Sequence, residues 1–227
     1  PPRSTLSSSS AASDVYKRQG IEISALGMGC WAIGGPFWEG ETPHGWGEVD
    51  DQESIRAIHA ALEGGITFFD TANVYGAGHS ERVLGRALAG RREDVVIATK
   101  FNALFDETSR QVTGSDPSPT GIRKACEESL TRLATDHIDL YQFHDNGYPA
   151  NQAGPVRETL ESLVQEGKIR AYGWSTDFPD RAEVFAQGAS CTSIQLQLNV
   201  LDDNPDVIAI CERHDLAAIC RGPLAMG

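Results

Sequence analysis

The chain has 227 residues with a formal net charge of −13, and 40 % of its residues are hydrophobic. This length and apolar content predict one globular domain with a full core rather than a disordered chain. The acidic balance argues against nucleic acid or an anionic membrane as a partner, because both attract clusters of Lys and Arg. No apolar run approaches the ~20 residues of a membrane helix, so we expect a cytoplasmic protein.

The five cysteines are scattered along the chain and include no Cys-x-x-Cys pair. This spacing predicts neither a zinc site nor a disulfide framework, and we expect no metal. We interpret the cysteines as buried thiols in a reducing compartment. They are Cys30, Cys126, Cys191, Cys211 and Cys220.

The first twenty residues differ in composition from the rest. Residues 7–13 form a low-complexity run of Ser and Ala, and residues 14–19 resemble translated vector or adapter sequence. We interpret residues 1–20 as a non-native or disordered leader and exclude them from the fold. Residues 21–227 are then the folded domain.

From residue 21 onward, short apolar runs typical of strands alternate with segments of helical pattern. A glycine-punctuated strand at 25–31 is followed by a long loop over 32–49, and Asp50 then opens a capping box. Ser80 and Glu81 are predicted to cap the next helix, and a polar loop covers 101–119. The remaining strands are predicted at 67–70, 95–100, 138–144, 169–175, 193–198 and 216–220, and helices at 51–62, 80–88, 120–133, 156–166, 181–186 and 207–213.

Repeated strand–helix units with nearly continuous apolar strands predict a parallel sheet covered by helices. Four strands end at Asp70, Lys100, His144 and Ser175, at intervals of 30, 44 and 31 residues (100 − 70, 144 − 100, 175 − 144). These intervals are near the ~31 residues per unit of an eight-unit barrel of about 250 residues. The predicted fold class is therefore α/β, an incomplete (β/α)8 TIM barrel of about seven units. Because the strands of such a barrel end at one face, the four side chains should converge.

Three consecutive strand ends carry ionisable groups, and Tyr75 follows the first of them after five positions (75 − 70). Taken singly, Asp70 could cap a loop, Tyr75 could be a packed aromatic, Lys100 a solvated charge and His144 a satisfied strand histidine. Their coincidence at one predicted face favours catalysis over these structural roles.

The stretch around Asp70 resembles the signature of the aldo-keto reductases. The resemblance covers the chain from about residue 20 to its end, and it implies NADPH-dependent reduction of an aldehyde or ketone on a (β/α)8 barrel. It implies the catalytic tetrad Asp70, Tyr75, Lys100 and His144. The matching segments are 69–76, 78–81, 84–85, 99–100, 139–144, 173–175, 195 and 222–224.

The implied chemistry explains the residue types. Hydride addition to a carbonyl carbon builds negative charge on its oxygen, so a proton donor must lie within hydrogen-bond reach, and Tyr75 is the candidate. A lysine ammonium within ~4 to 6 Å lowers the pKa of a phenol by roughly 1 to 3 units, and Lys100 would supply it. Asp70 would keep that ammonium charged. His144 would orient the carbonyl or relay a proton.

Cofactor contacts follow from the resemblance alone, since no Gly-x-Gly-x-x-Gly motif opens a helix. Ser175 and Gln195 would bind the nicotinamide carboxamide of NADP, with Thr176 beside them. Arg221 would stack on the nicotinamide ring in place of the usual aromatic, as a planar guanidinium can. The other implied cofactor contacts are Cys30, Trp31, Asp70, Pro223, Leu224, Met226 and Gly227.

The aldo-keto reductases continue, beyond the matched part, with a helix, an eighth strand and a segment that binds the adenosine 2′-phosphate. With these absent from the sequence, the first and seventh strands should be exposed edges. We therefore expect this chain to bind NADP weakly and to aggregate.

Two other functions fit parts of the pattern. A non-catalytic nicotinamide-binding regulatory subunit would share the fold, but the potassium-channel β subunits carry Asn where this chain has His144. A metal-dependent barrel enzyme would need clustered His and carboxylate ligands, and only His144 qualifies. The loops 34–48 and 102–118 are predicted to surround a small-molecule carbonyl substrate. Their aromatic residues, expected either to line the pocket or to pack, are Trp38, Trp46 and Phe105.

Overall fold

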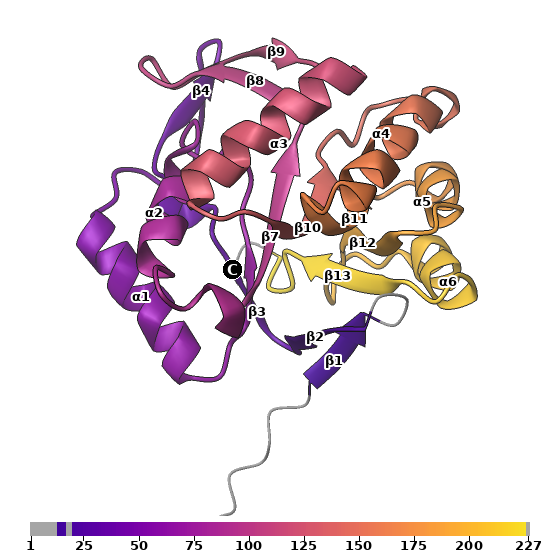
Figure 1. Ribbon diagram of the computed structural model, residues 1–227, viewed down its shortest axis with the longest axis horizontal. Helices are drawn as coiled ribbons and strands as arrows, with labels where there is room; N and C mark the ends of the chain where they lie inside the picture. Colours follow the sequence, from indigo (N-terminus) through magenta and orange to yellow (C-terminus); the bar gives the residue numbers. More distant parts are fainter. Residues whose placement is uncertain (1–12, 17–19, 226–227) are drawn as a thin grey trace, which may run out of the picture.

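The computed structural model describes residues 13–16 and 20–225 (Figure 1). Seven parallel strands form one curled sheet in the order β13-β12-β11-β10-β7-β6-β3. The incomplete barrel predicted from the sequence is confirmed, and β3 and β13 are the two edges of its sheet in the described residues. The strands are β3 (Gly27–Gly29), β6 (Phe68–Asp70), β7 (Val96–Phe101), β10 (Ile138–Phe143), β11 (Ile169–Ser175), β12 (Cys191–Gln197) and β13 (Ala217–Arg221).

Six α-helices of the described chain connect these strands and cover the outside of the sheet (Figure 1). None of them is long and apolar enough to cross a bilayer. The helices are α1 (Asp51–Glu63), α2 (His79–Ala87), α3 (Pro119–Leu133), α4 (Gly154–Gln165), α5 (Pro179–Ala186) and α6 (Pro205–Arg213).

The structure confirms the predicted cap of α1 and contradicts the predicted cap of α2. Asp50 caps α1 as predicted, because its Oδ1 accepts from the backbone N–H groups of Gln52 at 2.7 Å and Glu53 at 3.0 Å. The predicted cap of α2 is wrong, since α2 begins after Gly78, whose φ is 84°. Ser80 and Glu81 are buried instead, and the Ser80 hydroxyl donates to the Cys30 carbonyl at 2.7 Å.

Both segments predicted as long loops contain strands. They form a second sheet in the order β5-β4-β9-β8, which lies beyond the carboxyl end of β7 (Figure 1). Its strands are only three to five residues long, and the pairing of β4 with β9 joins Trp38 to Gln111, far away in sequence. Local composition therefore gave no signal for it. The strands are β4 (Phe37–Glu39), β5 (Thr42–His44), β8 (Ala103–Asp106) and β9 (Gln111–Ser115).

Part of the predicted leader has regular structure. Residues Ser13–Tyr16 form β1, which pairs antiparallel with β2 (Ile21–Ser24). Residues 1–12 and 17–19 lie outside the described part of the chain, so the leader itself stays a prediction.

Strand alternation decides which side chains enter the barrel. In β7, Val96 and Ala98 belong to the small apolar cluster enclosed by strands, whereas Ile97 and Phe101 pack in the larger cluster beneath the helices. Because strand side chains alternate between faces, Lys100 follows Val96 and Ala98 into the interior. A lysine at this position therefore carries its charge into the barrel.

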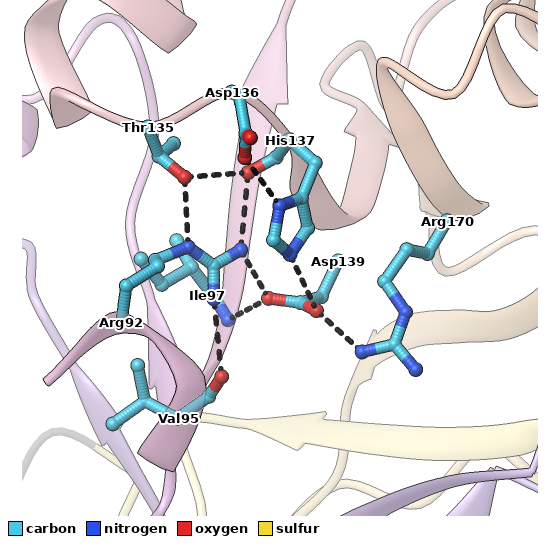
Figure 2. Close-up of polar contacts among 8 residues, drawn as sticks. All are labelled: Arg92, Val95, Ile97, Thr135, Asp136, His137, Asp139 and Arg170. Carbon is cyan, nitrogen blue, oxygen red and sulfur yellow. Dashed lines mark hydrogen bonds and ion pairs between the residues drawn. The ribbon is translucent and has the colours of Figure 1, made fainter.

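The opposite end of the sheet carries a buried ionic cluster (Figure 2). Asp139, at the start of β10, accepts from Arg92 at 2.7 Å, from Arg170 at 2.8 Å and from the backbone N–H of Ile97 at 2.9 Å. The side chain of Asp139 is only 1 % exposed. Because these contacts tie β7 to β10 and β11 at their amino ends, away from the strand ends where barrel sites lie, we assign the cluster to stability.

Candidate active site

Asp70, Tyr75 and Lys100 meet at the carboxyl end of β6 and β7, as predicted from the sequence. The Nζ atom of Lys100 lies 2.5 Å from Asp70 Oδ1 and 3.3 Å from Tyr75 Oη. It also donates to the carbonyl of Thr71 at 2.8 Å, and its side chain is 1 % exposed. The ammonium is thus buried between a carboxylate and a phenol.

The loop after β6 is fixed by close backbone packing. Gly76 has φ 60°, and a Cβ at this position would lie 1.8 Å from the carbonyl oxygen of Gly34. Only glycine tolerates both the left-handed backbone and this approach. The contact holds the loop against the 3₁₀ turn at Ala32–Gly34 and sets the position of the neighbouring Tyr75.

The charges of this group follow from burial and from its neighbours. Burial alone lowers the pKa of Lys100, but the Asp70 carboxylate and Tyr75 outweigh it, so the pKa is raised above 10.5. Burial raises the pKa of Tyr75 above its ordinary 10.0, and the opposing charge of Lys100 does not overcome it. The prediction of a lowered tyrosine pKa is therefore wrong for this structure. Tyr75 is protonated and Lys100 is charged at neutral pH.

His144 completes the predicted tetrad. It directly follows β10, and its backbone N–H donates to the Phe101 carbonyl at 3.0 Å. Its ring meets the Tyr75 ring edge-on, with centroids 6.1 Å apart. Burial, with the charges of Lys100 and Arg221, lowers the pKa of His144 to about 3, so the imidazole is neutral at neutral pH. Among the described residues no side chain forms a hydrogen bond with this ring, which leaves its nitrogens for a ligand.

The second oxygen of Asp70 accepts from two amides. Gln195 donates to Oδ2 at 2.9 Å, and Gln142 donates to the same atom at 3.0 Å. Sequence reasoning assigned Gln195 to the cofactor and missed Gln142. The sequence feature that could have identified Gln142 is a polar residue at an inward-facing position of β10, two places before His144.

A cavity of about 1380 Å³ opens beside this group and reaches down between β3 and β13. The aromatic residues predicted for its wall, Trp38, Trp46 and Phe105, are not among the side chains that line it. The second sheet contributes Phe37, Glu39, His44, Ala103, Val112, Gly114 and Ser115 instead. Several site residues predicted from the sequence do line the cavity. They are Cys30, Trp31, Asp70, Tyr75, His144, Ser175, Gln195, Arg221 and Pro223.

Two predicted cofactor contacts, Thr176 and Leu224, are not among the residues that line the cavity. The hydroxyl of Thr176 donates to Asn146 Oδ1 at 3.1 Å, and Leu224 is 81 % exposed. Met226 and Gly227 lie outside the described residues. Like the other cofactor contacts, these four residues stay predictions.

Three predicted contacts that do line the cavity have specific neighbours. Arg221 forms an ion pair with Asp177 and donates to Gln197 Oε1 at 3.3 Å. Trp31 stacks on Tyr75 with ring centroids 5.9 Å apart. Cys30 is buried, and burial raises the pKa of its thiol, which favours the protonated form. Of the five cysteines only Cys220 is exposed, against the expectation that all are buried.

Two features describe the ionisable side chains of the site. Within the described ranges, no group of three His, Cys, Asp or Glu side chains could hold a metal ion. A protonated phenol and a neutral imidazole line the cavity, with a buried ammonium behind the phenol, and this combination suits proton donation to an oxygen atom.

Comparison with known proteins gives consistent matches. Residues 25–227 match the model of the Aldo/keto reductase family. The chain is 36 % identical over 221 residues to the aldo-keto reductase YhdN of Bacillus subtilis (strain 168), covering 92 % of this chain and 60 % of that protein. The chain spans 58 to 63 % of the length of the curated relatives it matches.

Solved structures share the fold as well. The holo form of aldo-keto reductase AKR11C1 from Bacillus halodurans has a TM-score of 0.84 at 32 % identity, covering 96 % of this chain and 68 % of that one. An aldo/keto reductase from Klebsiella pneumoniae in complex with NADP and acetate has a TM-score of 0.74 at 28 % identity, with coverage of 93 % and 68 %.

Proposed function

Because the chain belongs to the aldo/keto reductase family, we propose that it forms the catalytic part of an NADP(H)-dependent oxidoreductase that reduces an aldehyde or ketone to an alcohol. The observation that carries the proposal is the placement of Lys100 Nζ between Asp70 Oδ1 and Tyr75 Oη beside His144. Tyr75 is the proposed proton donor.

The cavity suits a nicotinamide cofactor. Ser175 and Gln195 present a hydroxyl and an amide next to Asp70, and the guanidinium of Arg221, which is paired with Asp177, also lines the cavity. These groups match the hydrogen-bonding carboxamide and the anionic phosphates of NADP(H). The Klebsiella pneumoniae relative, whose structure contains NADP, supports the same cofactor for this chain. When bound, the nicotinamide supplies the hydride.

The residues of the chain handle the substrate oxygen and its proton. A carbonyl oxygen within reach of Tyr75 Oη and the neutral His144 ring accepts hydrogen bonds from both. As negative charge builds on that oxygen, Tyr75 releases its proton. The tyrosinate that forms lies beside the Lys100 ammonium, whose charge stabilises it, and Asp70 holds the ammonium in place.

Apolar side chains around the phenol limit access of water. Trp31 covers one face of the Tyr75 ring, and Phe37 and Val112 extend the apolar wall of the cavity. A low-dielectric wall strengthens the electrostatic contact of Lys100 with the developing tyrosinate. The wall also favours substrates with apolar substituents.

The test follows NADPH oxidation with a panel of aldehydes and ketones, and NADPH binding by nicotinamide fluorescence. Tyr75→Phe should lose nearly all turnover and keep NADPH binding, because only the phenol proton is removed. Tyr148→Phe is the matched control, since this tyrosine packs on Phe143 away from Lys100. NADPH binding without turnover in the unaltered protein would favour the regulatory-subunit alternative. Absence of both, even at NADPH concentrations high enough to detect weak binding, would refute the proposal.

A further inference from the structure

The geometry points to Gln142 as a positioning residue that holds Asp70 in the orientation required by Lys100. The inference rests on the function proposed above and deepens it. Gln142 lies on β10, directly beside Lys100 on β7 in the strand register. Its Nε2 donates to Asp70 Oδ2 at 3.0 Å.

In the described residues, the hydrogen bond to Asp70 is the polar contact made by the Gln142 side chain. Its side chain is fully buried, it does not line the cavity, and its Oε1 has no hydrogen-bond partner among the described residues. A buried amide with an unpaired oxygen costs stability, and an apolar side chain of similar size would pack without that cost. The inward-facing neighbour Leu140 has such a side chain. An apolar residue at position 142 would therefore lose one favourable contact, the hydrogen bond to Asp70.

The two oxygens of Asp70 have separate partners. Oδ1 accepts from Lys100 at 2.5 Å, and Oδ2 accepts from both Gln142 and Gln195. Gln195 differs from Gln142 because it lines the cavity and its Oε1 accepts from Ser175. A ligand that draws the Gln195 amide away leaves Gln142 as the side-chain donor that fixes Oδ2. The carboxylate then cannot rotate away from the ammonium.

The charge of Lys100 depends on this orientation. Asp70, Tyr75, Cys30 and His144 all face its ammonium. Burial raises the pKa of both Tyr75 and Cys30, so both are neutral at neutral pH, and His144 is neutral as well. Asp70 is thus the negative group among these four. If its carboxylate turned away, burial would lower the pKa of Lys100.

The experiment compares Gln142→Leu with the unaltered protein. Gln142→Met keeps the unbranched shape and serves as a second apolar variant, and Gln142→Glu replaces the donor with an acceptor beside Asp70. Thr192→Val is the matched control, because Thr192 is equally buried and its hydroxyl has no partner in the described structure. The readouts are the pH profile of kcat for NADPH oxidation and the titration of Lys100 by NMR of labelled lysine side chains.

The apolar variants should lower the pKa of Lys100 and move the alkaline limb of kcat to lower pH. A shift of one unit corresponds to about a tenfold loss of kcat above that pH. Gln142→Glu should lose more of its kcat than the apolar variants, because two carboxyl groups in contact repel each other. Thr192→Val should change neither readout.

An unchanged Lys100 titration in Gln142→Leu and Gln142→Met would overturn the inference, as would an equal shift in Thr192→Val. If the unaltered protein lacks turnover while the NMR shift appears, the positioning role stands and the proposed function fails. The NMR readout therefore separates the two failures.

Discussion

Replacing Lys100 with methionine removes the charge beside Tyr75 and keeps most of the side-chain volume. The ammonium lies 3.3 Å from the phenol oxygen. With an effective dielectric constant of about 20, a full charge pair at that distance is worth ~5 kcal/mol. In the transition state the phenol has transferred only part of its proton. About half of that energy, ~2.5 kcal/mol, then applies, which corresponds to a loss of kcat on the order of 70-fold.

The assay is steady-state oxidation of NADPH with the best carbonyl substrate, measured for Lys100→Met across pH. Lys124→Met is the matched control, because the Lys124 side chain is 73 % exposed on α3 and pairs with Glu128 far from Tyr75 in sequence. We expect the control to keep its kcat, and Lys100→Met to bind NADPH while its turnover falls. A kcat within about threefold of the unaltered protein would refute the argument, since threefold is less than ~1 kcal/mol.

Two further predictions concern stability. Asp139→Asn should lower the free energy of unfolding by ~3 kcal/mol in urea titrations, because it leaves the partly buried Arg92 without its counter-charge. The neighbouring Asp136→Asn, at a 95 % exposed side chain, should have almost no effect, and equal losses would contradict the assignment. The pKa of His144 is about 3 in the fold against 6.5 ordinarily, so the unfolded chain binds a proton that the folded chain excludes as pH falls through that window. The Tm of His144→Gln should therefore fall less than the Tm of the unaltered protein between about pH 7 and about pH 4. An equal fall of Tm in the two proteins would count against a neutral, buried imidazole.

The parallel strands and their helices were readable because each has a local signal. The run at β11 (Ile169–Ser175) is mostly apolar and includes Ile169, Tyr172 and Trp174, and its predicted and observed bounds coincide. The cap at Asp50 is a local hydrogen-bonding pattern, so the start of α1 could be predicted as well. The second sheet has no such signal. Its strands are stabilised by pairing between Trp38 and Gln111, which no local window contains.

The electrostatics of the site show the same limit. Sequence reasoning placed Lys100 next to Tyr75 and inferred a lowered tyrosine pKa from the pair alone. Burial of Tyr75 is a property of the packed fold, and it raises the pKa more than the lysine lowers it. Gln142 was overlooked for a related reason, because its role depends on where Asp70 Oδ2 lies in space.

By itself the sequence determined the order of the strands and helices of the barrel, the family resemblance and the four residues that meet at the barrel mouth. Those features depend on strand periodicity and on the rule that parallel strands end at one face. Only the tertiary structure decided the partners of each Asp70 oxygen, the neutral state of His144 and the walls of the cavity. These depend on distance and burial, which arise when residues 70, 100, 142 and 195 come together from separate strands.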